Sequence, residues 1–144
     1  QSWVGVFEGD GRLGWLRSLD SEGYPLRGGL AVHDRTVKLL SKQAGPVSGL
    51  TLPPAADGGT DQQGSFLIGY TFSPAGQQLG TALIAQDLGG AGLVALPDGG
   101  LVAEAIGFAR TLPSRVGERD GGTRALPTPP ADWDQMLYLL RVDF

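Results

Sequence analysis

Several residue types that build reaction centres are missing or scarce in this sequence of 144 residues. It has no cysteine, which excludes disulfide bonds, thiolate metal sites and a cysteine nucleophile. Its one histidine, His33, cannot by itself form a histidine-rich metal site. The G-x-S-x-G motif that presents the serine nucleophile of many hydrolases is also absent. We therefore expect no catalytic, cofactor-binding or metal-binding residues, no cofactor and no enzymatic activity.

Positive charge is also sparse. The formal net charge is −4, and no lysine or arginine occurs between residues 43 and 109. The charge is unevenly placed, because residues 1–50 carry a net charge of +1 and residues 51–144 carry −5. Binding to a nucleic-acid backbone requires clustered cations. Nucleic acid is therefore not expected as the main partner.

Long apolar runs are missing as well. The longest candidate for a membrane span, residues 79–96, contains Gln86, Asp87 and four glycines, which is unlike a transmembrane helix. The sequence begins with Gln1 and not with methionine, so we expect it to be processed or truncated, with any signal or anchor segment lying upstream.

Glycine and proline, by contrast, are abundant, with 24 and ten copies. Both residues favour turns, and apolar segments occur between them along the whole sequence. No internal repeat and no linker divides the chain. The sequence predicts one domain over residues 1–144, mainly β with an α+β arrangement as the alternative, built from short antiparallel strands.

The first segments favour a β-hairpin. Residues 2–8 and 13–19 carry apolar side chains, and an Asp-Gly pair in the turn at 9–11 favours positive φ angles. We expect Trp3 and Trp15 to face each other across this hairpin.

Residues 30–44 fit two structures. Their apolar side chains approximate a helical stripe that the glycine–proline pair at 45–46 would end. Their β-branched residues also fit two short strands around a turn at 33–35, which is the arrangement that we favour.

Alternation and turn signals predict the remaining strands. In residues 65–72 one face is apolar and buried, and in the last segment Met136, Tyr138 and Leu140 alternate with Leu137 and Leu139. Exposed loops are expected over 55–64 and 111–130, and Gly89 and Gly90 are expected to end a strand. A hairpin turn is expected at 97–100, where proline comes first and glycine stands where φ becomes positive. The strands are expected over residues 47–52, 65–72, 79–88, 93–96, 101–108 and 133–144.

Four short motifs were weighed as sites, and each has a stronger structural explanation. His33 beside Asp34 lacks a serine partner for a catalytic triad, so a surface turn is favoured. Residues 8–11 lack the acidic spacing of a calcium loop, and residues 89–92 lack the lysine and helix of a phosphate loop. The motif at 132–134, Asp-Trp-Asp, is either a ligand-facing patch or, as we favour, an aromatic anchor of the last strand.

The order of segments in the last two-thirds resembles the soluble domain of minor pilins and pseudopilins of the W/J type, from type IV pilus and type II secretion systems. Members of this family have a short strand, a strand–turn–strand, a further strand, a variable loop and a closing strand that begins with tryptophan. The matching segments are Gly49–Leu52, Gly69–Phe72 with Pro74–Leu79, Leu101–Phe108, and Trp133–Phe144.

This resemblance implies a pilin-like β-sheet domain that helps to initiate or cap a filament. It implies other pilin-like subunits as partners and a location from the inner membrane and periplasm to an extracellular filament of the bacterial cell surface. The family's N-terminal apolar helix, its contact with the membrane, has no counterpart here, so the resemblance requires that this helix was removed. A secreted or virion β-module that binds protein or glycan through its loops is the alternative, and a carboxylate-based hydrolase is a third.

Overall fold

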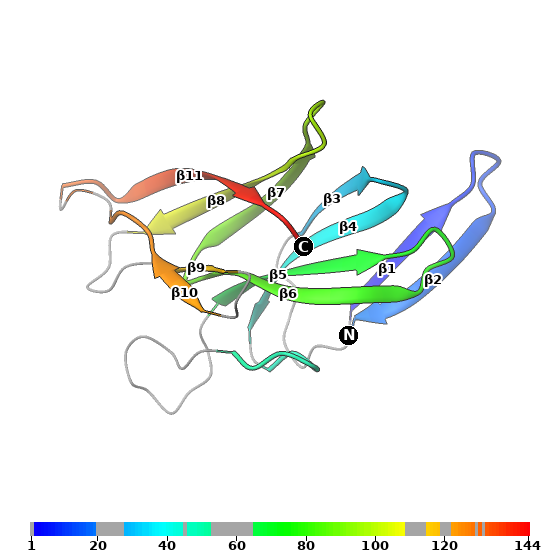
Figure 1. Cartoon of the computed structure of the whole chain (residues 1–144), viewed down its shortest axis with the longest axis horizontal. Coiled ribbons are helices and arrows are strands. Elements are labelled where there is room, and N and C mark those ends of the chain that lie inside the picture. The colour runs from blue at the N-terminus through cyan, green and yellow to red at the C-terminus, as the bar shows by residue number, and fades with distance from the viewer. Residues whose placement is uncertain are drawn as a thin grey trace.

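The computed structural model describes residues 2–19, 28–44, 46–52, 65–108, 115–118, 122–128, 130 and 132–144 (Figure 1). Within these ranges the chain forms β-strands and no helix, so the prediction of a mainly β fold is confirmed and the α+β alternative is not observed there. Nothing helical in these ranges has the length and apolarity that crossing a membrane requires.

The strands form three antiparallel sheets of two, six and three strands. The two-stranded sheet is the hairpin β1–β2, the six-stranded sheet has the order β10-β9-β6-β5-β4-β3, and the three-stranded sheet has the order β11-β8-β7. The strand bounds are β1 Ser2–Phe7, β2 Leu13–Leu19, β3 Gly28–His33, β4 Thr36–Ala44, β5 Ser65–Phe72, β6 Gln78–Gln86, β7 Gly89–Ala95, β8 Leu101–Phe108, β9 Arg115–Gly117, β10 Thr123–Ala125 and β11 Gln135–Val142.

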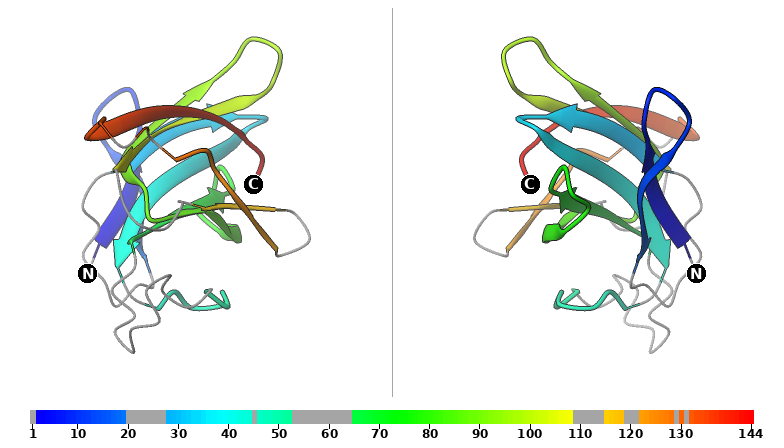
Figure 2. Two further views of the ribbon diagram at one scale, coloured as in Figure 1. Left: turned by 90° about the vertical axis from the view of Figure 1, so that its left-hand side faces the viewer. Right: turned by 90° about the vertical axis from the view of Figure 1, so that its right-hand side faces the viewer.

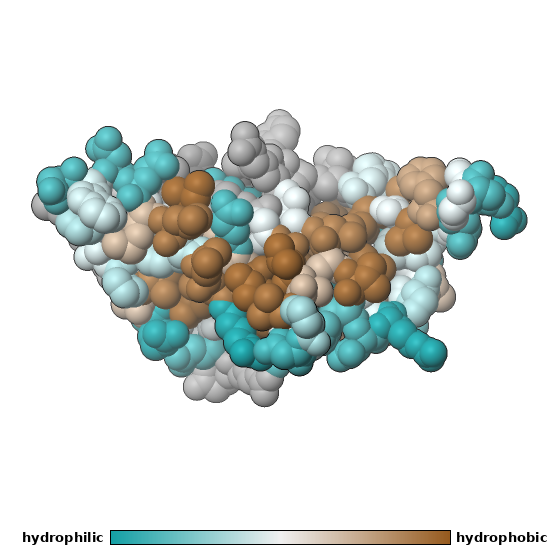
Figure 3. Space-filling view, turned by 90° about the horizontal axis from the view of Figure 1, so that it is seen from above, coloured by the Kyte–Doolittle hydropathy of each residue, from teal (hydrophilic) through white to brown (hydrophobic). Residues whose placement is uncertain are grey.

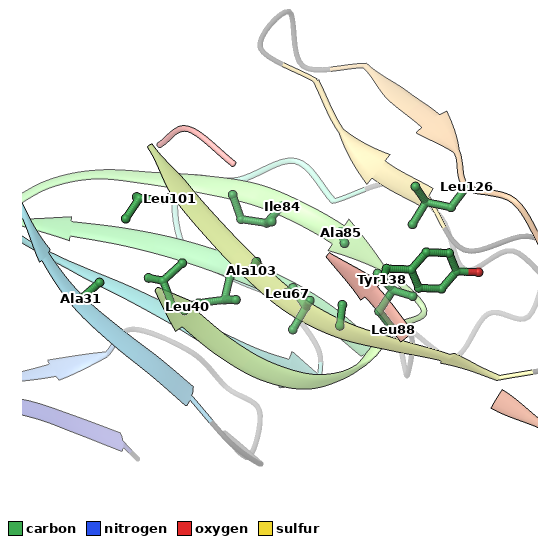
Figure 4. Close-up of a cluster of buried hydrophobic side chains, with 12 residues drawn as sticks. Ala31, Leu40, Leu67, Ile84, Ala85, Leu88, Leu101, Ala103, Leu126 and Tyr138 are labelled. Carbon is green, nitrogen blue, oxygen red and sulfur yellow. The ribbon is translucent and has the colours of Figure 1, made fainter. Parts of the chain in front are cut away.

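The six-stranded sheet is the central layer. On one face it packs against the three-stranded sheet, and the two side views show β11 arching above β3 and β4 (Figure 2). The cluster between these two sheets runs from Ala31 and Leu101 at one end to Leu126 and Tyr138 at the other (Figure 4). The opposite face is covered by the β1–β2 hairpin and by apolar residues of the segment 46–52.

The central strand β5 shows the effect of this layering. Phe66, Ile68, Tyr70 and Phe72 pack in the cluster beneath the hairpin, as the alternation predicts. The prediction of a single buried face was wrong, however, because Leu67 on the opposite face is also fully buried, under the three-stranded sheet. A sheet covered on both faces buries both sets of alternating side chains.

Trp15 of β2 fixes the hairpin to the β5–β6 turn. Its Nε1 donates to the carbonyl of Pro74 at 3.0 Å, and its ring covers Gly76, whose φ of +78° favours glycine. Trp3 was expected opposite Trp15 but pairs with Ser18 and is 57% exposed. Because neighbouring positions on a strand alternate between faces, Val4 is the residue of β1 that points into the core, and Trp3 points to solvent.

Residues 30–44 form two strands, as favoured, joined by a two-residue turn. Asp34 and Arg35 have φ angles of +46° and +58°, as a tight hairpin of this hand requires at both central positions. The turn at 97–100 also forms as predicted, with Gly99 at a φ of +84°.

Several predicted boundaries were wrong. Residues 47–52 form an isolated bridge at Val47 followed by a turn at Gly49, and not a strand. Gly89 and Gly90 belong to β7, and the preceding strand ends at Gln86. The expected loop at 111–130 contains the short strands β9 and β10. The loop predicted at 55–64 lies outside the described residues.

Candidate functional site

The outer surface of the molecule carries many large apolar side chains. Figure 3 shows them extending across the face seen from above, with polar side chains around them. Large contiguous apolar areas on a protein surface mark interaction sites more often than isolated exposed apolar residues do. The exposed large apolar residues are Trp3, Phe7, Leu13, Leu16, Leu30, Val32, Leu79, Val94, Trp133, Leu137 and Leu139.

The outer face of the three-stranded sheet holds one group of these residues, which we call the outer sheet surface: Val94, Val102, Ile106, Leu137 and Leu139. Leu137 lies opposite Ile106, and Val94 lies opposite Val102, so the side chains of each pair share a face. The alternation of β11 that sends Tyr138 into the core turns Leu137 and Leu139 outward, where they are 58% and 70% exposed.

One charged side chain, Glu104, interrupts this surface. It lies opposite Leu139 on the neighbouring strand and is itself exposed. Arg141 stands at the rim, where its guanidinium is 3.2 Å from a carboxylate oxygen of Asp98. The outer sheet surface is therefore mainly apolar but holds Glu104 among its apolar residues, whereas the centre of a protein interface is usually depleted in charged residues.

β11 is also an open sheet edge. It pairs with β8 on one side, in a continuous register over eight residues, and has no ladder partner on the other side among the described strands. It contains no proline and no bulge, and Arg141 near its end is its one charged side chain. Prolines, bulges and charged side chains are the features that usually protect an edge strand from pairing with another chain. Two other edges are less open, since β10 has three residues and the register of β7 is interrupted between Gly89 and Gly92. β3, the other edge of the six-stranded sheet, pairs with β4 in an uninterrupted register over six residues.

A second group of exposed apolar residues belongs to the β1–β2 hairpin. We call Trp3, Phe7, Leu13 and Leu16 the hairpin surface. β1 pairs with β2 alone among the described strands. The hairpin therefore exposes apolar side chains and, along the outer side of β1, backbone groups that pair with no other described strand.

A polar pocket of about 360 Å³ lies between the β3–β4 turn, the β7–β8 turn and the end of β11. His33 lines it, with Nδ1 3.5 Å from an oxygen of Asp34 and with Nε2 buried and lacking a hydrogen-bond partner within the described ranges. No serine hydroxyl in those ranges is bonded to the ring. Among the described residues, the geometry therefore provides a carboxylate beside the imidazole without the serine partner of a catalytic triad.

Lys38 and Arg141 are the basic side chains that line this pocket among the described residues, and Lys38 already has polar partners. Its ammonium group donates to the Thr71 hydroxyl at 3.0 Å and to the backbone oxygen of Phe144, and it lies 5.2 Å from the centre of the Phe144 ring. Burial lowers the pKa of Lys38 below its ordinary value, and the Asp34 carboxylate opposes this shift. The lysine therefore ties the chain after β11 to the central sheet.

A larger pocket of about 520 Å³ lies between β6, β9 and the end of β11. Its charged side chains include Glu118, which lies 3.4 Å from Arg124. Across the described ranges of the chain, no three histidine or acidic side chains gather closely enough to hold a metal ion.

The short motifs at residues 8–11, 89–92 and 132–134 lie outside the two pockets. Asp10 binds Arg12 at 2.6 Å, and the backbone N–H and side chain of Arg12 lower the pKa of the Asp10 carboxyl, so this residue supports the hairpin turn. Residues 89–92 lie in β7 and not at a helix start. Trp133, which the sequence favours as an aromatic anchor of the last strand, is 54% exposed and lies beside the exposed Asp132 and Asp134.

Alternation in the sequence places Leu137 and Leu139 on the face of the last strand opposite Tyr138 but does not indicate a function for them. The signal for a function was that both faces of this strand carry large apolar side chains, whereas a half-exposed strand would carry polar side chains on one face. Comparison of the chain with models of protein families, with curated proteins and with solved structures finds no match.

Proposed function

We propose that this chain is a non-enzymatic structural subunit that assembles with other protein subunits through its outer sheet surface. The observation that carries the proposal is the exposure of Leu137 and Leu139 on an open, unprotected edge strand. Fully burying one such leucine is worth roughly 1.5–3 kcal/mol. A partner strand on this edge would cover one flank of both side chains and would also satisfy the free backbone groups.

In its narrower form, the proposal makes the chain a minor pilin-like subunit that helps to initiate or cap a filament on the bacterial cell surface. The support is the resemblance in segment order, with three matching segments falling on β5–β6, β8 and β11. The fourth segment, Gly49–Leu52, departs from the pattern because it forms a turn and extended chain where the family has a strand. The partners would be other pilin-like subunits, and membrane contact would come from a helix outside this sequence.

A protein- or glycan-binding module is the second candidate. Its support is the exposed Trp133 between Asp132 and Asp134, because aromatic rings flanked by carboxylates can stack on sugars and accept their hydroxyl hydrogen bonds. The gene sequence upstream of Gln1 separates the two candidates. An apolar helix behind a glycine or alanine cleavage site supports the pilin, and a plain secretion signal supports the module.

Assembly itself is tested by size-exclusion chromatography of native extracts, with the chain detected by antibody. The wild-type chain is expected at the mass of a larger assembly. The double variant Leu137→Lys/Leu139→Lys is expected at the monomer mass, since two ammonium groups cannot be buried in an apolar interface without a large cost. Elution of the wild-type chain as a monomer would contradict the proposal.

Gln77→Lys is the matched control. Gln77 is exposed in the β5–β6 turn, outside the outer sheet surface, so its replacement adds positive charge without altering that surface. The control is expected to co-elute with the wild-type assembly. Loss of the assembly in this variant as well would show that added charge alone disrupts it, and the outer sheet surface would then lose its assigned role.

A further inference from the structure

We infer that copies of this chain associate head to tail, with β1 of one copy adding as a strand to the free edge of β11 in the next. This inference rests on the proposed structural function and identifies one partner as a second copy of the chain. The contact would extend the three-stranded sheet β11-β8-β7 by the β1–β2 hairpin of the neighbour.

The accepting edge is β11. Its eight residues pair without interruption along β8 and leave the other edge without a ladder partner among the described strands. Strand addition needs such an edge, because the backbone hydrogen bonds provide affinity and the alternating side chains provide specificity. Leu137 and Leu139 lie along this edge on the outer face.

The donating strand is β1. Its six residues, Ser2–Phe7, match most of the length of β11, and only β2 pairs with it among the described strands. Trp3 and Phe7 are 57% and 67% exposed, so both side chains are accessible to a partner. In an added strand, these side chains could pack beside Leu137 and Leu139.

The charge distribution favours this pairing over a two-fold pairing of β11 with its own copy. The exposed charges on and around β11 are mainly acidic: Glu104, Asp132, Asp134 and Asp143 against Arg141. A two-fold contact would bring two such acidic regions together, and facing like charges are destabilising. The described hairpin, residues 2–19, carries two acidic and two basic side chains and is neutral, so it adds no repulsion.

The positions of the two strands determine what such a contact builds. The longest axis of the molecule is horizontal in Figure 1, with β11 near the left end and the β1–β2 hairpin at the right end. A contact between two different surfaces leaves one of each free on the terminal copies, so it propagates unless the rotation closes a ring. Head-to-tail addition therefore predicts open chains of copies.

Two purified variants test this inference by sedimentation velocity over a range of concentrations. The first, Leu137→Lys/Leu139→Lys, blocks the accepting edge, and the second, Trp3→Lys/Phe7→Lys, blocks the donating strand. All four replaced side chains are more than half exposed, so folding is expected to be retained, and far-ultraviolet circular dichroism checks this.

The wild-type chain is expected to form species larger than dimers as concentration rises, and each variant alone is expected to stay monomeric. An equimolar mixture of the two variants is expected to form dimers and nothing larger, because only one intact contact can form per pair. The control Val32→Lys, on the exposed side of β3, is expected to behave like the wild type.

Three results would overturn the inference. A wild-type chain that stays monomeric at every concentration would exclude self-association. Dimers of the variant with blocked β1 would show a two-fold contact at β11, and dimers of the variant with blocked β11 would show a two-fold contact at the hairpin. In each case, an assembly containing other subunits in native extracts would still support the proposed function.

Discussion

Phe72 and Trp15 meet between the hairpin and the central sheet, with ring centroids 5.7 Å apart. Phe72 is completely buried, and Tyr70 stacks beside it at 6.4 Å. Phe7, on β1 of the same hairpin, is 67% exposed. The position of each aromatic ring relative to the pleat of its strand therefore decides whether it stabilises the fold or remains available to a partner.

Replacing Phe72 by alanine should lower the free energy of unfolding by about 3–5 kcal/mol, because the substitution leaves a cavity in a packed layer. Denaturant unfolding measures the change. The control Phe7→Ala should change stability by less than about 1 kcal/mol, as exposed substitutions usually do. Equal effects of the two substitutions would show that the assigned faces of β1 and β5 are wrong.

The carboxyl of Asp98 reports on the β7–β8 turn. The backbone N–H of Gly100, which donates to it at 3.0 Å, and then the nearby Arg141 lower its pKa below the ordinary value of 3.8. The charged form is favoured in the folded state, so the stabilisation is present above pH 3.8 and is lost as the pH falls through the lower folded-state pKa.

Carbon-detected NMR of the Asp98 carboxyl should therefore give a titration midpoint below 3.8. Arg141→Gln should raise the midpoint without restoring the ordinary value, because the Gly100 hydrogen bond is the larger cause. A wild-type midpoint at or above 3.8 would show that the turn does not hold this hydrogen bond in solution.

Among the strands, β3 and β7 make the closest approach between two sheets. A Cβ atom added at Gly29 would lie 2.4 Å from the backbone nitrogen of Leu93 and 2.8 Å from the carbonyl carbon of Gly92. These are backbone atoms, so rotating a side chain cannot relieve the contact. Glycine is required here because the two backbones touch.

Gly29→Ala should destabilise the fold by about 1–3 kcal/mol, the usual range for overpacking. Gly80→Ala in β6 is the matched control, since nothing lies within 4 Å of a Cβ atom there, and its effect should be small. Thermal unfolding measures both. Equal stability of the two variants would mean that the sheets separate at this contact in solution.

Alternation and turn chemistry are local, and the elements that depend on them could be predicted. β11 and the turn at 97–100 follow directly from residues that are neighbours in the sequence. The burial of Leu67 could not be predicted, because it depends on a sheet whose strands follow much later in the chain. The failure at residues 47–52 has a similar cause, since Val47 packs under the hairpin as part of an irregular segment.

The candidate site was only partly visible for the same reason. The sequence showed that Leu137 and Leu139 face away from Tyr138, but not that β11 forms the edge of its sheet. A strand forms an edge when no other strand pairs with it on one side, and a local sequence pattern does not show whether such a partner exists. The 54% exposure of Trp133 could not be predicted for a similar reason, because it depends on which segments pack beside the ring.

Across the molecule, as far as it is described, three layers of strands bury both faces of the central sheet and leave apolar side chains outside, among them the outer sheet surface and the hairpin surface. Neither is needed to close the core. Exposed apolar area of this kind favours aggregation unless a partner covers it. Assembly therefore explains why these apolar side chains are exposed, since the fold alone does not require them on the surface.

Amide hydrogen exchange tests this account most directly, by comparing β11 in the isolated chain with β11 in the assembly recovered from native extracts. The account predicts that the free-edge amides of Gln135–Val142 exchange rapidly in the isolated chain and become protected in the assembly, while β5 is protected in both. Equal exchange of β11 in the two samples would show that no partner covers this edge, and the proposed function would be wrong.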